Sequence, residues 1–165
     1  MSAADQLARG KYLSIVGGCI DCHTPGTFYG AQDTTRNLSG SELGWTGPWG
    51  TTYPRNLTPD PETGLGKYSA EDIVRAIRAG QRLDGSAMLP PMPWPNYAQM
   101  TDEDLLALAT YLKAIPAVSH KVPDRLAPGI KPPAALTFPP PPAWDAQNLP
   151  PPPAAPAEAR GDTKK

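Results

Sequence analysis

The two cysteines of this chain lie three positions apart, and a histidine follows the second one directly. The run is Cys19-Ile20-Asp21-Cys22-His23, a C-x-x-C-H pattern. Two cysteines at this spacing can each form a thioether with a vinyl group of one haem, and the next histidine can bind its iron as the proximal ligand. The pattern therefore predicts one covalently attached haem c, held by Cys19, Cys22 and His23.

Two other interpretations of the cysteine pair stay open at this point. A C-x-x-C pair can be a thioredoxin-like redox disulfide, but that interpretation expects a βαβ context, and none is visible nearby. The pair can also be half of a zinc site, which needs two further ligands. The only other strong candidate ligand is His120, far away on a proline-rich stretch. The spacing favours haem over both alternatives.

Proline divides the 165-residue chain into two parts. Residues 1–115 contain nine of the 23 prolines, whereas residues 116–165 contain fourteen. We expect a compact domain over residues 1–118, followed by an extended or partly disordered tail over residues 119–165. The side chains that could anchor this tail to the domain or to a partner are Leu136, Phe138 and Trp144.

Charge and hydropathy exclude several classes of protein. The net charge is −1, and neither part of the chain is strongly charged, so neither nucleic acid nor an anionic membrane is indicated as a partner. No run of about twenty apolar residues is present, so no membrane span is expected. Covalent haem attachment follows export, yet no secretory leader is visible. We expect a leader in the full gene product, replaced here by Met1, and a periplasmic location.

Three helices are predicted to position the motif. Apolar spacing predicts a first helix over residues 3–16, ending just before the cysteines. A second helix begins with Ser69 as its N-cap, in a variant of the capping box, and ends near Gly80. The third begins with Thr101 as its N-cap, and Pro116 stops it.

A stiff segment between the second and third helices is the expected source of a second iron ligand. Residues 88–95 contain four prolines, which exclude a regular helix and hold the chain extended. Proline brackets Met92 on both sides, so Met92 is more preorganised than Met88 and is the expected distal ligand. Met100 is better explained as a hydrophobic staple, and His120 as a solvated side chain.

The haem carboxylates need cations or hydrogen-bond donors. Candidates are Trp45, Trp49, Arg55, Asn56 and Arg78. Arg78 is equally explained as a solvated helix residue, and the two tryptophans as packing for the long stretch 24–67, which could wrap one edge of a cofactor. Trp94 and Tyr97 follow Met92 closely and are expected near the distal face of the haem.

The order of these features resembles that of class I c-type cytochromes. The shared order is a helix, the C-x-x-C-H motif, a Met-Pro segment and a final helix. The resemblance implies an all-α fold with three or more helices around one covalent haem, and with His23 and Met92 as axial ligands. It also implies that Gly10 on the first helix lies against the last helix near Leu108 and Tyr111.

A narrower resemblance covers about residues 7–118. Its motifs are Ala8-Arg9-Gly10-Lys11-Tyr12-Leu13, Asp21-Cys22-His23-Thr24-Pro25, Asn56-Leu57-Thr58-Pro59-Asp60, Thr63-Gly64-Leu65-Gly66, Arg75-Ala76-Ile77-Arg78-Ala79-Gly80 and Met92-Pro93-Trp94. They look like the cytochrome subunits of bacterial quinoprotein alcohol dehydrogenases, sugar-acid dehydrogenases and molybdenum hydroxylases. Those subunits often carry three such modules, whereas this chain has one.

The resemblance implies an electron carrier without substrate chemistry of its own. Such a carrier passes single electrons from a periplasmic dehydrogenase to an oxidase or another cytochrome of the respiratory chain. A permanent electron-transfer subunit of one dehydrogenase complex is the alternative, and a catalytic or gas-binding haem is a third. In many class I cytochromes a proline carbonyl accepts the N–H of the proximal imidazole, and here Pro25, Pro48 and Pro54 compete for that role.

Overall fold

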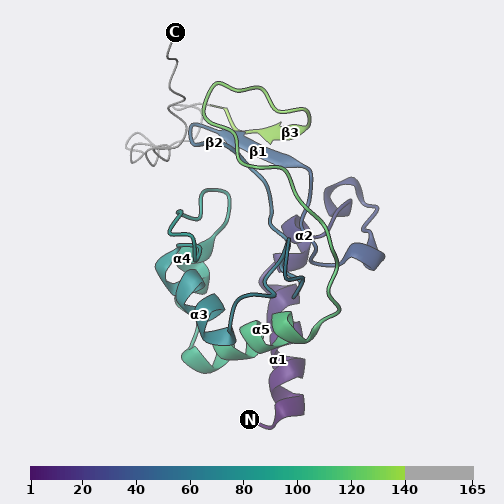
Figure 1. Cartoon of the computed structure of the whole chain (residues 1–165), viewed down its shortest axis with the longest axis vertical. Helices are drawn as coiled ribbons and strands as arrows, with labels where there is room; N and C mark the ends of the chain where they lie inside the picture. The colour runs from purple at the N-terminus through teal and green to yellow at the C-terminus, as the bar shows by residue number, and fades with distance from the viewer. Residues whose placement is uncertain (140–165) are drawn as a thin grey trace.

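The computed structural model describes residues 1–139 of the chain (Figure 1). The elements run in the order α1 (Ala3–Val16), α2 (Cys19–His23), η1 (Thr27–Tyr29), η2 (Thr34–Arg36), β1 (Gly44–Gly47), β2 (Gly50–Thr52), α3 (Ala70–Ala79), α4 (Trp94–Tyr97), α5 (Asp102–Ala114) and β3 (Ala135–Thr137). Within the described residues, no helix is both long and apolar enough to cross a membrane.

The three predicted helices are present as α1, α3 and α5, and local capping explains where they begin. The Ser69 hydroxyl accepts a hydrogen bond from the Asp72 N–H, and the Asp72 carboxylate accepts one from the Ser69 N–H. Thr101 caps α5 by accepting a bond from the Asp104 N–H. These bonds satisfy backbone donors that the first turn of a helix otherwise leaves without a partner, which confirms the predicted starts.

Helices α1 and α5 cross in close contact, as the resemblance implied (Figure 1). A Cβ atom on Gly10 would lie 2.1 Å from the carbonyl oxygen of Ala107 and 2.5 Å from the Cβ of Tyr111. The crossing therefore depends on the missing side chain of this glycine. Beside it, the Arg9 guanidinium donates two hydrogen bonds to the Asp104 carboxylate, at 2.8 and 3.1 Å, and joins the two helices.

The core lies where α1, α3 and α5 meet. Its buried members are Leu13, Leu38, Ile73, Ile77, Leu105, Leu108, Ala109 and Leu112. Met100 stands just before the N-cap of α5 and packs against this core, which agrees with its expected role as a packing residue. In the described part of the chain, these eight side chains, of which one is alanine, make a small core for a domain of this length.

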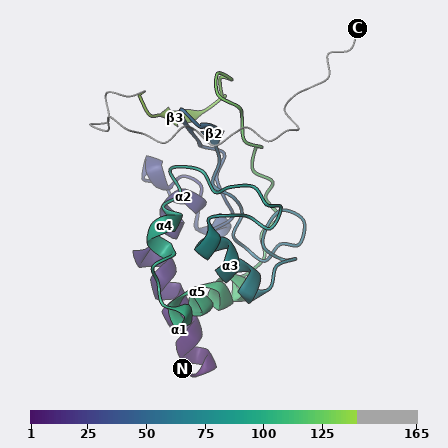
Figure 2. The ribbon, with the colours of Figure 1, turned by 90° about the vertical axis from the view of Figure 1, so that its left-hand side faces the viewer.

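A small three-stranded sheet departs from the expected all-α fold. Strand β1 pairs antiparallel with β2 and parallel with β3, so the order is β2-β1-β3. The sheet lies at the end of the molecule opposite the N-terminus (Figures 1 and 2). Its strands are three or four residues long, and β1 and β2 contain glycine. The sequence therefore shows no alternation of apolar and polar residues that would predict them.

The chain after α5 returns along the body and reaches this sheet (Figures 1 and 2). Leu136 pairs with Trp45 across β1 and β3. The Phe138 ring lies 6.0 Å from the Trp45 ring and 5.6 Å from the Trp49 ring, measured between centroids. Two of the three expected anchors thus contact the domain. Trp144 lies outside the described residues, and the domain boundary after residue 118 stays a prediction.

Candidate functional site

Both cysteines and His23 stand on α2, a single short helix that follows α1 directly. Neither cysteine forms a disulfide, and both thiols are partly buried. Burial raises the pKa of the Cys19 thiol to about 11, and burial likewise raises the pKa of Cys22. A thioredoxin-like cysteine needs a lowered pKa to react as a thiolate. The raised pKa values therefore do not favour the redox-disulfide interpretation. The two cysteines lie about one helical turn apart on α2, as attachment to one haem requires.

The His23 imidazole is buried and held in one orientation. Its Nδ1 donates a hydrogen bond of 2.6 Å to the backbone carbonyl of Arg55. Burial lowers the pKa of His23, and the bond to Arg55 opposes that shift only in part, so the neutral ring is favoured. Among residues 1–139, no group bonds to Nε2. A neutral imidazole with Nδ1 protonated and Nε2 free is the form that binds a metal.

The acceptor for Nδ1 is Arg55, which corrects the expectation of a proline carbonyl. The carbonyl of Pro25 accepts instead from the Asp33 N–H, and that of Pro54 accepts from the Ser41 N–H. Pro48 stands in the turn between β1 and β2. Every residue offers a carbonyl, so side-chain types could not single out this acceptor.

Two backbone segments, residues 38–41 and 54–57, surround His23, and we call them the histidine frame. The Gly40 N–H donates to the His23 carbonyl at 2.8 Å. Two further bonds join the segments to each other, from the Ser41 N–H to the Pro54 carbonyl and from the Leu57 N–H to the Leu38 carbonyl. The position of the Arg55 carbonyl therefore depends on how well the frame is held together.

The segment with Met92 is anchored at several points. The Met88 N–H donates to the Gly80 carbonyl at 2.7 Å, and the Thr52 hydroxyl donates to the Pro90 carbonyl at 2.9 Å. The Trp94 indole packs so closely on Gly80 that a Cβ there would lie 2.3 Å from the ring. The segment is not extended throughout, because α4 begins at Trp94, where proline in the first turn is tolerated.

Tyr97 joins this segment to the cysteine motif. Its hydroxyl donates a hydrogen bond of 2.5 Å to the carbonyl of Gly17, two residues before Cys19. Burial, with smaller effects from Cys19 and Cys22, raises the pKa of Tyr97 to about 12. Tyr97 follows Met92 by five residues, so the end of the methionine segment meets the start of the motif. Iron ligation by Met92 stays a prediction, as does contact of Trp94 with the haem.

The Asn56 side chain is fully hydrogen-bonded within the protein. Its Nδ2 donates to the Thr63 hydroxyl and the Val118 carbonyl, at 2.9 and 2.7 Å. Its Oδ1 accepts from both the N–H and the hydroxyl of Thr58. All four bonds that the amide can make are thus made within the protein, and none remains for a cofactor. The side chain thus holds the histidine frame, and contact of Asn56 with the haem stays a prediction.

Among the expected carboxylate partners, Arg55 keeps a suitable setting. Its half-buried guanidinium lies 3.4 Å from the Pro123 carbonyl and 3.7 Å from the exposed Asp124 carboxylate. Burial lowers the pKa of Arg55, and the nearby positive charge of Arg82 lowers it further. The carboxylates of Asp124 and Asp84 oppose both effects. A half-buried guanidinium in this setting can still donate to a further carboxylate. Arg82 was missed because its loop position carries no signal in the sequence.

Arg78 and Trp49 are engaged elsewhere. The Arg78 guanidinium donates to the Ala98 carbonyl and to the Asp102 carboxylate, so it ties the end of α3 to the start of α5. The Trp49 indole N–H donates to the Trp45 carbonyl at 3.3 Å. Both residues therefore stabilise the fold, in agreement with the structural explanation of each.

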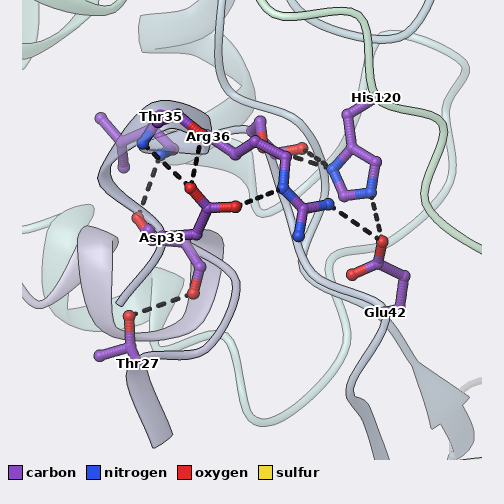
Figure 3. A network of polar contacts seen from close by, with 9 residues as sticks. Thr27, Asp33, Thr35, Arg36, Glu42 and His120 are labelled. Atoms are coloured by element: carbon purple, nitrogen blue, oxygen red, sulfur yellow. Dashed lines mark hydrogen bonds and ion pairs between the residues drawn. The ribbon is translucent and has the colours of Figure 1, made fainter. Parts of the chain in front are cut away.

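His120 is not solvated, contrary to expectation. Its side chain is only 11% exposed. Nδ1 donates to the Ser39 carbonyl at 2.8 Å, and Nε2 lies 2.7 Å from a Glu42 carboxylate oxygen (Figure 3). The chain after α5 turns back across the histidine frame and buries this ring. Such a return by a proline-rich segment cannot be read from local sequence.

Two cysteines and a buried histidine on one short helix, placed beside a methionine segment and a crossing of the first and last helices, define a c-type cytochrome domain. The chain belongs to the cytochrome c family, because residues 7–116 match the family model described as "Cytochrome c". Membership of this family implies covalently bound haem c.

Several curated proteins are similar to this chain over most of the domain. The cytochrome c subunit of alcohol dehydrogenase (quinone) from Gluconobacter oxydans (strain 621H) is 37% identical over 122 residues, 72% of this chain. The gluconate 2-dehydrogenase cytochrome c subunit from Pantoea cypripedii is 40% identical over 62% of this chain. The fructose dehydrogenase cytochrome subunit from Gluconobacter japonicus is 36% identical over 64%.

These relatives are much longer than the matched region. The matches span 24%, 22% and 20% of the three relatives, respectively. The similarity therefore describes one cytochrome domain within larger proteins. All three are named as cytochrome subunits of dehydrogenases, which agrees with the resemblance drawn from the sequence motifs.

Proposed function

We propose that this chain is a mono-haem c-type cytochrome that carries single electrons from a periplasmic dehydrogenase toward the respiratory chain. The observation that supports this most is the state of His23. Its ring is buried and neutral, Nδ1 is held by the Arg55 carbonyl, and Nε2 has no partner among the described residues. Cys19 and Cys22 stand on the same helix, so one haem meets all three side chains.

Each residue has a distinct part in the proposed site. Cys19 and Cys22 would form the thioethers, and Nε2 of His23 and the sulfur of Met92 would bind the iron. When bound, the haem supplies a one-electron couple at its iron. The bond from His23 Nδ1 to the Arg55 carbonyl fixes the ring and makes Nε2 more basic, which favours the oxidised state.

The cofactor carboxylates have proposed partners in Arg55 and Arg82. The positive charge of Arg82 acts unfavourably on the Arg55 guanidinium, which itself lies 3.7 Å from the Asp124 carboxylate on the returning chain. A carboxylate near the two arginines offsets that effect. Trp94, packed on Gly80 at the end of α3, is proposed to cover the distal side beside Met92.

A haem iron that both His23 and Met92 would bind is suited to electron transfer and not to substrate chemistry. Histidine and methionine together leave no position where oxygen, peroxide or a substrate binds the iron. The proposed location is the periplasm, since covalent haem attachment takes place after export. The proposed donor is a dehydrogenase of the kind that the relatives serve by name.

Intact-protein mass and gas binding test this proposal together. We expect the purified holoprotein to weigh one haem more than its polypeptide and to keep that mass after denaturation, because the attachment is covalent. We expect the reduced protein to show no spectral change under carbon monoxide, because Met92 occupies the sixth position. Two haems per chain, a haem lost on denaturation, or rapid carbon monoxide binding would each contradict the proposal.

A permanent electron-transfer subunit is the second candidate, favoured by the printed names of the relatives. All three reported relatives are subunits of named dehydrogenases. Gentle purification from native cells distinguishes the two. A free carrier elutes alone at the size of the monomer, whereas a permanent subunit stays with one dehydrogenase at a fixed ratio through successive columns.

A further inference from the structure

The short segment Val118–His120 bonds to both halves of the histidine frame. On one side, the Val118 carbonyl accepts from Asn56 Nδ2 at 2.7 Å, and the Val118 N–H donates to the Thr58 hydroxyl at 3.1 Å. On the other side, His120 Nδ1 donates to the Ser39 carbonyl at 2.8 Å. Three residues that follow α5 therefore connect residues 38–41 with residues 54–57, the two segments of the histidine frame.

The segment Val118–His120, which we call the bridge, contacts buried residues on the side of the histidine frame and charged side chains on the side of solvent. Asn56 is 2% exposed and Ser39 is fully buried. On the outer side, His120 Nε2 faces the Glu42 carboxylate, which also receives the Arg36 guanidinium at 3.4 Å (Figure 3). Arg36 is paired in turn with Asp33 at 2.8 Å. The outer ion pairs are exposed and worth little, so the inner bonds carry the bridge.

The bridge acts at the two places that fix His23. Ser39 precedes Gly40, whose N–H donates to the His23 carbonyl. Asn56 follows Arg55, whose carbonyl accepts from His23 Nδ1. A shift of either half of the frame would therefore lengthen or bend the bond at Nδ1, and the basicity of Nε2 depends on that bond.

We propose that His120 and Asn56 are positioning residues for the proximal imidazole. They tie the returning chain to the histidine frame and thereby set the strength of the His23 bond to Arg55. His120 lies just beyond residues 7–116, the part of the chain that matches the family. This inference rests on the proposed function, because the position of His23 affects the couple only when His23 binds the iron.

Two substitutions of His120 separate positioning from charge. In His120→Ala the bond to Ser39 is lost and the histidine frame loosens. Nε2 of His23 then becomes less basic, so the reduced state is stabilised relative to the oxidised state. At a fixed solution potential we expect the ratio of reduced to oxidised protein to rise up to about tenfold, which is about 59 mV for one electron. In His120→Asn the amide nitrogen replaces Nδ1 and keeps the bond to Ser39, so the potential should stay near that of the wild type.

Amide hydrogen exchange gives a readout of the frame itself. The Gly40 N–H is held by the His23 carbonyl and the Leu57 N–H by the Leu38 carbonyl, so the exchange of both should quicken in His120→Ala and not in His120→Asn. Glu42→Gln tests the outer side and should leave both rates and potential nearly unchanged. If His120→Ala is too unstable to purify, Thr58→Val removes the hydroxyl bonds to Val118 and to Asn56 Oδ1 with little change in shape and should shift the potential the same way.

Three results would overturn the positioning role. One is an unchanged potential and unchanged exchange in His120→Ala and Thr58→Val. Another is an equal shift in His120→Ala and His120→Asn, since both remove the ring and any charge on it but only the first removes the bond to Ser39. A third is a shift in Glu42→Gln as large as in His120→Ala. Failure of the proposed function is visible separately, as a wild-type protein without a histidine-ligated haem c spectrum.

Discussion

The double substitution Cys19→Ala, Cys22→Ala is expected to remove all covalent haem and to leave the domain without a cooperative fold. Both thioethers are lost, so the haem is not retained when the protein is denatured. Within residues 1–139, the main core cluster has eight buried side chains, around α1, α3 and α5, with partly buried apolar side chains packed against them. A covalent haem adds a large apolar surface for packing. Without the haem, the free energy gained by burying so small a core does not offset the conformational entropy lost on folding.

Haem staining after denaturing electrophoresis and circular dichroism on heating measure the two effects. The double variant should show no stain and no cooperative thermal transition. Asp21→Ala is the matched control, because Asp21 is exposed and lies between the cysteines without altering the C-x-x-C-H spacing. It should keep full haem content and a sharp transition. Covalent haem in the double variant would show that other residues attach it, and a sharp transition there would show that the core needs no haem.

Gly10→Ala is expected to destabilise the folded protein by about 2 kcal/mol or more, the upper part of the usual range for overpacking. The new methyl group would lie 2.1 Å from the Ala107 carbonyl oxygen and 2.5 Å from the Tyr111 Cβ. Both are fixed parts of α5, so α1 and α5 must move apart. Alanine favours the helix by about 1 kcal/mol over glycine, and the clash has to exceed that gain.

Denaturant unfolding of the holoprotein measures this change. Lys11→Ala is the control, since Lys11 is the next residue of α1 and points to solvent. Its effect should stay within about 0.5 kcal/mol, as for most surface substitutions. Should Gly10→Ala prove as stable as the wild type, the close crossing of α1 and α5 would not exist in solution.

The sequence predicts the parts of this molecule that depend on neighbouring residues. The caps at Ser69 and Thr101 and the stop at Pro116 are local signals, and the helices begin and end where these signals stand. The C-x-x-C-H motif is local as well, so its three side chains could be named before the structure. The close approach at Gly10 followed from the resemblance to class I cytochromes and not from spacing.

The remaining features depend on contacts between distant residues. The acceptor for His23 is a backbone carbonyl at Arg55, and a carbonyl has no signature in the sequence. His120 was expected in solvent because the proline-rich chain around it does not reveal that it returns to the body. Strand β3 was missed for the same reason, as was the bond from Asn56 to the Val118 carbonyl, since Val118 lies on the same returning chain.

The near-infrared spectrum of the oxidised holoprotein is the most direct measurement of the proposed site. A haem bound by His23 and Met92 gives a weak band from sulfur to ferric iron, together with a sharp α-band once the protein is reduced. We predict that the near-infrared band is present in the wild type, is lost in Met92→Ala, and is retained in Met88→Ala. A band that survives in Met92→Ala and disappears in Met88→Ala would contradict the ligand assignment. A wild type with no such band would contradict histidine–methionine ligation altogether.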